Sequence, residues 1–506
     1  MNHTQFNRIY LIFYLVLLGA HVTLIWFLKY IPTQDGPSHI YNLVILRDLL
    51  HGGEIWGAYY THHLQLSPNL GFQIFAYPLL SFLDPWQAEK AFLSIYIFLM
   101  GLSVPVFLKT FDRPVFPVSF FVVPVIFNFT LLMGFYSYCI AIPFFLMAFS
   151  LAWYIRQKAF LLKILTYNIC GFFVFCLHLI PFTFYILALL SVSASEYLSK
   201  NKNTKILFQN LAALIPLIFL LSYYLLTQSQ SASFSYDYLL SLERLAYLFT
   251  DLASFSTFNF TIVHFIPSSL FSAMVWALII IGIKTNLLNK KFGQIFQSPY
   301  FVTALVLFLI YFIFPFGFAG GAYFNQRFPW VILLLLLPLI RFPVSDIFMR
   351  SKSIIIICFA ILIFMFNSAF MWKHSFLVED YTIGLTVPIP KDSLIMGFKH
   401  AGMDTARADI LLHAISHYAL AHKTVNVGNY EARLEYFPVQ FSEDFPTVPS
   451  RALIEISPWE IDWNRYPDID FLVAWEIEQD ERNKINKFFG LVFEQESLSI
   501  WSKDEK

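Results

Sequence analysis

Residues 9–50 read IYLIFYLVLLGAHVTLIWFL followed by KYIPTQDGPSHIYNLVILRDLL, and this stretch decides the expected class of fold. The run 9–28 is apolar and has the length of about 20 residues that a helix needs to cross a bilayer. No small-residue cleavage site follows it, so we expect a retained transmembrane helix rather than a removed signal peptide. The segment 38–50 begins after Pro37 and ends before a Gly-Gly pair, which predicts a second helix. Its apolar face predicts that it lies in the membrane interface.

The composition of the whole chain agrees with a membrane protein. Of 506 residues, 58% are hydrophobic and only 13% are charged, whereas soluble domains carry about 25% charged residues. The net charge of zero is an average over two unlike parts. Residues 1–372 hold 20 Lys and Arg against 11 Asp and Glu, and residues 373–506 hold 13 against 22. We therefore predict a membrane domain over 1–372 and a soluble domain over 373–506.

Apolar runs recur along the first part and predict about eleven transmembrane helices. They cover 9–28, 86–108, 115–132, 135–155, 164–180, 181–198, 206–226, 268–287, 300–316, 328–341 and 353–372. Fifteen Lys and Arg residues fall on the loops of the N-terminal side and five on the other side. The positive-inside rule then predicts a cytoplasmic N-terminus and an outward, periplasmic or extracellular C-terminal domain, as in a bacterial inner membrane protein.

The loops and the soluble part have recognisable elements of their own. The first outer loop, about 29–85, should carry a further interfacial helix over 69–82, and the second, about 227–266, a helical stretch over 237–252. The C-terminal part has the pattern of a small α/β domain. We expect strands near 393–397 and 470–475, helices over 405–422 and 479–488, and a final pair of strands. The four cysteines all lie in apolar runs and indicate no disulfide framework.

Charged residues point to a site at the membrane edge. None lies centrally in a predicted span, which disfavours a transporter, whereas eight acidic residues fall on the outer loops. Asp35 stands out because Pro32 and Pro37 stiffen the segment around it and Gly36 permits close approach of a ligand. A carboxylate fixed there could act as a general base or bind a divalent cation. Alternatively, Asp35 caps the helix that begins at Pro37.

A single span followed by Asp35-Gly36-Pro37-Ser38-His39 resembles the GT-C glycosyltransferase superfamily, in particular the protein O-mannosyltransferase and lipid A aminoarabinose transferase families. The resemblance implies a polytopic enzyme that takes sugar from a polyprenyl-phosphate carrier, with Asp35 as the catalytic acidic residue. Several members carry a second acidic residue or an acidic pair, and no Asp-x-Asp or Glu-x-Asp occurs in the outer loops here. Asp84 is a candidate second carboxylate, although it also suits the cap of the second span. Dependence on Mg²⁺ or Mn²⁺ is left open.

A phosphate leaving group gains charge in the transition state and needs a cation nearby. Arg327, in the outer loop before the span 328–341, is the first candidate, because arginine can hold phosphate with two parallel hydrogen bonds. Arg244 is the second, and an interfacial anchor is the alternative role for such a residue. His39, one turn after Asp35, and His178, at the outward end of a span, are further possible substrate contacts.

Two motifs of the C-terminal part give weaker indications. His413 and His417 have the i, i+4 spacing of a zinc site on the predicted helix 405–422, but no third ligand is evident. Asp468-x-Asp470 precedes an apolar strand and is better interpreted as a turn than as a nucleotide-sugar metal motif.

The sequence thus predicts an α-helical polytopic membrane protein of GT-C type with a small C-terminal α/β domain. The expected function is transfer of a sugar from a polyprenyl-phosphate donor to a lipid, glycan or protein acceptor, with membrane lipids but no nucleic acid as further partners. A lipid-linked oligosaccharide polymerase or ligase is the main alternative. A transporter and a non-catalytic assembly protein are weaker alternatives.

Overall fold

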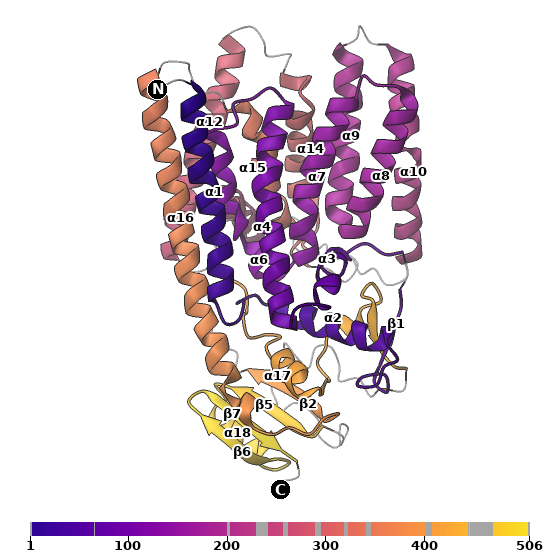
Figure 1. Cartoon of the computed structure of the whole chain (residues 1–506), viewed down its shortest axis with the longest axis vertical. Coiled ribbons are helices and arrows are strands. Elements are labelled where there is room, and N and C mark those ends of the chain that lie inside the picture. The colour runs from indigo at the N-terminus through magenta and orange to yellow at the C-terminus, as the bar shows by residue number, and fades with distance from the viewer. Residues whose placement is uncertain are drawn as a thin grey trace.

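The structure is a computed structural model that describes residues 3–64, 66–199, 203–228, 241–256, 262–288, 295–317, 322–340, 346–399, 407–443, 445 and 469–503. It consists of a helix bundle and a small sheet domain at one end of it (Figure 1). The N-terminus lies at the opposite end of the bundle from the sheet domain (Figure 1). We call these the N-terminal end and the domain end of the bundle.

Within the described residues, eight helices are long and apolar enough to cross a membrane. Apolar side chains on their outer faces are exposed, such as Ile12 on the first helix, as expected for contact with lipid. The eight helices are α1 (His3–Phe27), α4 (Pro85–Thr110), α7 (Tyr136–Ile155), α8 (Phe160–Leu177), α9 (Leu179–Ser199), α10 (Thr204–Gln228), α12 (Ile262–Leu288) and α16 (Asp346–Tyr381).

The three remaining predicted spans are shorter or broken. The span 300–316 corresponds to α14 (Pro299–Ile313). The span 328–341 is divided into α15 (Pro329–Leu336) and the 3-10 turn η3 (Leu337–Leu339). The span 115–132 consists of η1 (Val118–Val122), α5 (Val123–Ile126) and α6 (Phe129–Leu132). One continuous helix was therefore the wrong expectation for 115–132 and 328–341. In the first case Asn128 starts a new helix, because its side chain accepts hydrogen bonds from the amides of Thr130 and Leu131.

At the domain end, α2 (Gly36–Leu50) lies across the bundle between its helices and the C-terminal domain (Figure 1). Ten of its 15 residues are buried. The location of α2 in the membrane interface stays a prediction. Protein covers α2 on both sides, because α17 (Ile415–His422) packs against it. The helix predicted over 69–82 is α3 (Gly71–Leu79). The stretch predicted over 237–252 is α11 (Leu242–Ser254), and residues 237–240 lie outside the described residues.

The C-terminal domain is built on a five-stranded sheet of order β3-β2-β5-β7-β6. Strand β2 pairs in parallel with β3 and β5, with Ile395 opposite Phe471, and β7 pairs antiparallel with β5 and β6. The predicted helix 405–422 is present only as α17, because residues 407–414 form turns and 400–406 lie outside the described residues. The other elements are β2 (Leu394–Lys399), β3 (Val425–Asn426), β5 (Phe471–Trp475), α18 (Gln479–Ile485), β6 (Gly490–Gln495) and β7 (Leu498–Ser502).

A second, two-stranded sheet ties the first loop to this domain. Strand β1 (Tyr60–His62) pairs antiparallel with β4 (Val439–Phe441), so that Thr61 lies opposite Gln440. A second connection is α16, which runs without a break from the bundle to Tyr381 and leads directly into the C-terminal domain. The domain is thus attached to the bundle by a continuous helix, by a strand pair and by the packing of α17 on α2.

Candidate active site between the bundle and the C-terminal domain

Asp35 lies at the start of α2 and is buried, with 8% of its surface exposed. Its side chain makes no hydrogen bond to the helix N-terminus, so the alternative role as a side-chain cap is wrong. The carboxylate instead contacts other side chains. The amide Nε2 of Gln34 donates to Oδ1 at 3.1 Å, and Nε2 of His413 lies 3.6 Å from the same oxygen.

The turn 133–135 fixes the position of Asp35. The amide of Asp35 donates to the carbonyl of Met133 at 3.3 Å. Gly134 adopts a φ of +84°, and a Cβ on it would lie 2.8 Å from both the Cβ and the N of Asp35. Only glycine satisfies both conditions, because side chains are strained at this φ and would collide with Asp35.

Burial gives Asp35 the protonation behaviour of a general base. It raises the pKa of this carboxyl from 3.8 to about 6, although the His39 charge and the Gln34 amide oppose the increase. Asp35 is therefore ionised at neutral pH but binds a proton more readily than an exposed aspartate. A pKa slightly below the working pH suits a group that must accept a proton during reaction.

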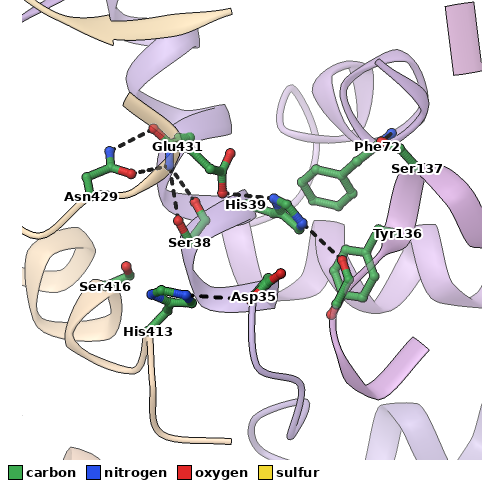
Figure 2. A network of polar contacts seen from close by, with 12 residues as sticks. Asp35, Ser38, His39, Phe72, Tyr136, Ser137, His413, Ser416, Asn429 and Glu431 are labelled. Atoms are coloured by element: carbon green, nitrogen blue, oxygen red, sulfur yellow. Dashed lines mark hydrogen bonds and ion pairs between the residues drawn. The ribbon is translucent and has the colours of Figure 1, made fainter. Parts of the chain in front are cut away.

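His39 lies one turn further along α2 and pairs with a residue almost 400 positions away (Figure 2). Its Nδ1 is 2.8 Å from Oε1 of Glu431, and its Nε2 is 3.0 Å from the carbonyl oxygen of Gly134. Burial lowers the pKa of His39, but the Glu431 carboxylate outweighs this effect and the pKa rises to about 9. Both ring nitrogens then carry hydrogen and donate, so His39 is an imidazolium.

Asn42 and Asn429 continue this contact between the two parts of the chain. Each donates its side-chain amide to the other's oxygen, at 2.8 and 2.9 Å. Neither Glu431 nor Asn429 was predicted from the sequence. No local pattern marks them, because their partners lie on α2, far away in the sequence.

His413 approaches Asp35 from the C-terminal domain (Figure 2). Its ring stacks on Tyr430, with centroids 4.5 Å apart and planes at 28°. His417 lies elsewhere and stacks on Trp86 at 4.4 Å. The helical spacing of the two histidines was misleading, because α17 begins only at Ile415 and His413 precedes it in a turn.

A second buried carboxylate lies beneath the Asp35 segment. Glu89, in the first turns of α4, accepts a hydrogen bond of 2.5 Å from the hydroxyl of Tyr136, which also contacts Thr33 at 2.8 Å. Gly36 leaves room for this group, since a Cβ there would lie 2.7 Å from Oε1 of Glu89. The close approach that Gly36 permits is thus to protein groups, and the prediction of a close ligand at Gly36 is not supported.

Arg327 lies at the end of the 3-10 turn η2 (Asn325–Arg327) and is buried, with 8% of its surface exposed. Its guanidinium is 4.3 Å from the ring centre of Phe135 and is also near the rings of Tyr138 and Phe324. It donates one hydrogen bond of 3.3 Å to the Ala322 carbonyl, and its buried Nε has no partner. In the described part of the chain, no carboxylate forms an ion pair with it.

The turn 133–135 links Arg327 to Asp35. Its Met133 carbonyl holds Asp35, its Gly134 carbonyl holds His39, and its Phe135 ring packs on Arg327. The charge of Asp35 acts on Arg327 across this turn. The structure therefore brings together a buried carboxylate, an imidazolium and a guanidinium that lacks an anionic partner.

His178 and Arg244 lie beside Arg327. His178 packs edge-on against Tyr138, whose ring also faces Arg327 and whose hydroxyl donates to the Arg327 carbonyl. Arg244 on α11 donates to the Phe314 carbonyl and, at 3.3 Å, to Oδ1 of Asn325. Its Nε and Nη1 are buried and have no partner among the described residues. Arg244 thus braces the turn that carries Arg327.

Asp84 is outside this group of residues. It is exposed, and its side chain accepts a hydrogen bond of 3.0 Å from the amide of Gln87 at the start of α4. The alternative prediction, a helix cap, is confirmed. Among the described residues, no group of three or more His, Cys, Asp or Glu side chains could hold a metal ion.

These features define a class of protein: a polytopic helix bundle whose buried acidic site lies at one end and is covered by a soluble domain. A scan against protein-family models gives no match, and a search of curated proteins gives none either. Among solved structures, the chain is similar to ArnT from Cupriavidus metallidurans bound to undecaprenyl phosphate. The TM-score is 0.52 and the identity 9%, over 99% of this chain and 98% of that one. The apo form of ArnT gives a TM-score of 0.48 at 10% identity, over 97% and 98%. The chain therefore has a fold similar to that of ArnT, in agreement with the fold that the sequence resemblance implied.

Proposed function

We propose that the protein is a membrane glycosyltransferase that moves a sugar from a polyprenyl-phosphate donor to an acceptor. One observation carries the proposal. Asp35 provides a buried carboxylate, and Arg327 provides a buried guanidinium that has no anionic partner among the described residues. Both residues contact the turn 133–135 at the domain end of the bundle. A buried cation is costly unless an anion pairs with it, so Arg327 is suited to a ligand that brings negative charge.

The chemistry would be a single displacement. The acceptor O–H or N–H attacks the anomeric carbon of the sugar, and the bond from that carbon to the phosphate oxygen breaks with its electron pair leaving on the phosphate. Asp35 takes the acceptor's proton, which its pKa of about 6 permits at neutral pH. Arg327 stabilises the charge that develops on the phosphate, with two parallel hydrogen bonds available for the purpose. His178, which packs against Tyr138 next to Arg327, is a further candidate for a substrate contact, whereas Glu431 and the Gly134 carbonyl already hold both ring nitrogens of His39.

The fold supports a lipid-linked donor. ArnT, whose fold this chain shares, is described as bound to undecaprenyl phosphate. We infer that the N-terminal end of the bundle is cytoplasmic, because Lys and Arg are concentrated on the loops of that side. The site would then lie at the outer surface of a bacterial inner membrane. In this assignment residues 1–372 bind the donor lipid, and residues 373–506 form an outward domain.

The described side chains around Asp35 offer few ligands for a divalent cation. Both ring nitrogens of His39 are occupied by Glu431 and the Gly134 carbonyl, which leaves Asp35 and His413 as the nearest donors. Two protein ligands are fewer than metal sites usually offer, although Mg²⁺ can be bound by one or two carboxylates together with substrate phosphates. We therefore assign no step to Mg²⁺ or Mn²⁺, and chelation of metal during the transfer assay tests this assignment.

A lipid-linked oligosaccharide polymerase or ligase is the second candidate, because Arg244 also has buried N–H groups without partners. Its donor would carry a diphosphate, and Arg244 and Arg327 could each bind one phosphate. The contact of Arg244 with Asn325, two residues before Arg327, connects Arg244 on α11 to the turn that carries Arg327.

The test is a transfer assay on the purified protein in lipid nanodiscs, with radiolabelled sugars on undecaprenyl phosphate and on undecaprenyl diphosphate. We expect transfer from the monophosphate and a decrease of about 10²–10⁴-fold in kcat for Asp35→Asn. Glu54→Gln is the control, since Glu54 is an exposed acid in the same loop. Full activity of a folded Asp35→Asn variant would overturn the role of Asp35. Transfer from the diphosphate alone would favour the second candidate.

A further inference from the structure

The C-terminal domain contributes side chains to the site as well as covering it. His413, Tyr430 and Glu431 all come from this domain, and Tyr430 stacks on His413. Figure 2 shows His413 and Glu431 next to Asp35 and His39 in the first turn of α2. We propose that His413 is a positioning residue, which donates its Nε2–H to Oδ1 of Asp35 and orients the carboxylate toward the acceptor. The inference rests on the proposed function, since Asp35 is its proton acceptor.

The first argument is geometric. Nε2 of His413 is 3.6 Å from Oδ1 of Asp35, and the two side chains are only 12% and 11% exposed. This distance is slightly beyond a normal hydrogen bond. Hydrogen bonds of catalytic groups are often long in the absence of substrate and shorten in the substrate complex.

The second argument is that the His413 ring is held in place. It stacks on Tyr430, and the next residue in the chain, Glu431, is anchored to His39 at 2.8 Å. On the other side, the amide of Ser416 donates to the His413 carbonyl at 3.1 Å. The stack thus restricts the tilt of the ring while its Nε2 lies 3.6 Å from Oδ1 of Asp35.

The third argument concerns the charges around Asp35. The imidazolium of His39 on α2 and the guanidinium of Arg327 on η2 already provide positive charge, while Glu431 provides negative charge. The hydroxyl of Tyr430 also donates to the carboxylate. Burial and, to a smaller extent, the His39 charge together lower the pKa of His413 to about 3, so its imidazole is neutral. A neutral His413 imidazole can donate a hydrogen bond to the Asp35 carboxylate. It does not take from Asp35 the proton that Asp35 has received from the acceptor substrate.

The experiment compares His413→Ala, His413→Gln and the control His422→Ala, which changes another histidine of the same domain. We expect a 10- to 100-fold decrease in kcat for His413→Ala with an unchanged KM for the donor. We also expect its kcat–pH profile to shift to higher pH, because Asp35 loses a donor that favours its ionised form. His413→Gln supplies an amide donor and should recover most of the activity and of the pH profile.

A second readout does not depend on transfer. Infrared difference spectra between the wild type and Asp35→Asn report the carboxyl band of Asp35 as a function of pH, and the same measurement is made in the His413→Ala background. An Asp35 midpoint at higher pH in that background supports the proposal. A midpoint and a kcat–pH profile equal to those of the wild type overturn it, as does a His413→Gln variant that is folded but as inactive as His413→Ala. If the wild type transfers no sugar at all, the proposed function fails, and the infrared midpoint still decides the contact of His413 with Asp35.

Discussion

Arg327 offers the sharpest test of the site, because its substitution should reduce function and leave stability nearly unchanged. We consider Arg327→Met, which keeps an apolar side chain of similar length between the rings of Phe135 and Phe324. The substitution removes the guanidinium and its buried Nε, which has no partner in the described residues. It also removes one long hydrogen bond, of 3.3 Å, to the Ala322 carbonyl.

The expected magnitudes follow from these contacts. An unsatisfied buried polar group costs about 1–3 kcal/mol, and its removal offsets the loss of the cation–π contacts, worth about 0.5–2 kcal/mol. The free protein should therefore melt within a few degrees of the wild type. The phosphate, in contrast, loses charge-assisted hydrogen bonds worth about 3 kcal/mol, which is about 150-fold in affinity.

The assay measures thermal unfolding of each variant with and without undecaprenyl phosphate, together with kcat/KM for transfer. The wild type should gain melting temperature on addition of the lipid phosphate, and Arg327→Met should lose this gain. Arg156→Met is a matched control, because Arg156 also lies over an aromatic ring, 3.7 Å from Trp153, but at the N-terminal end of the bundle. An unchanged lipid-dependent shift in Arg327→Met would refute the phosphate site. A large loss of stability in its free form would show that Arg327 is structural instead.

Three further predictions concern the surroundings of Asp35. The kcat of the wild type should rise with pH and reach half its maximum near pH 6, because the pKa of Asp35 is raised by burial to about 6 and only the carboxylate accepts a proton; a profile that is flat between pH 5 and 7 would contradict this. The ion pair of His39 and Glu431 stabilises the fold fully below pH 6.5, the pKa of His39 in the unfolded chain, and this contribution is lost as pH rises through about 9, its pKa in the folded protein. The melting temperature of the wild type should therefore fall over this pH range, and that of Glu431→Gln should fall much less. Gly134→Ala should destabilise the protein by at least about 1–3 kcal/mol and reduce transfer, because of its φ of +84° and the contact at 2.8 Å with Asp35. Gly19→Ala on α1 meets nothing within 4 Å and should leave both the melting temperature and transfer intact.

The sequence was sufficient to predict the helices of the bundle and the two central charged residues. Hydrophobic length is a local property, so runs such as 9–28 and 135–155 correspond directly to α1 and α7. Asp35 and Arg327 were recognisable because each interrupts an apolar region at a span end. The boundaries of the span 115–132 stayed open in the sequence because of its prolines and polar breaks, and the structure divides it into η1, α5 and α6.

The groups that complete the site could not be predicted in this way. No local pattern marks Glu431, and His413 stood out only by its spacing from His417. Their part in the site depends on the pairing of β4 with β1 and on the packing of α17 on α2. These are contacts between parts of the chain more than 350 residues apart. A single sequence contains no periodic signal for such pairings, so an amphipathic helix covered by a second domain has the same pattern as one lying on a membrane. For this reason the sequence alone predicted a membrane-interface helix for α2 and did not predict its packing against the C-terminal domain.

Three contacts between ionisable side chains join the bundle to the C-terminal domain. His39 meets Glu431 at 2.8 Å, Asp35 lies 3.6 Å from His413, and Asp251 of α11 pairs with Arg407 at 2.9 Å.

In each contact, one side chain comes from residues 1–372 and the other from residues 373–506. Neither part of the chain alone therefore holds both partners of any of the three contacts. Burial makes each contact depend on the docking of the two parts, because a buried charge that loses its partner is strongly destabilising. Residues 1–372 alone would leave Asp35, His39 and Asp251 without these partners. The boundary between a membrane domain and a soluble domain, drawn from charge and hydropathy, therefore passes through the middle of the candidate active site.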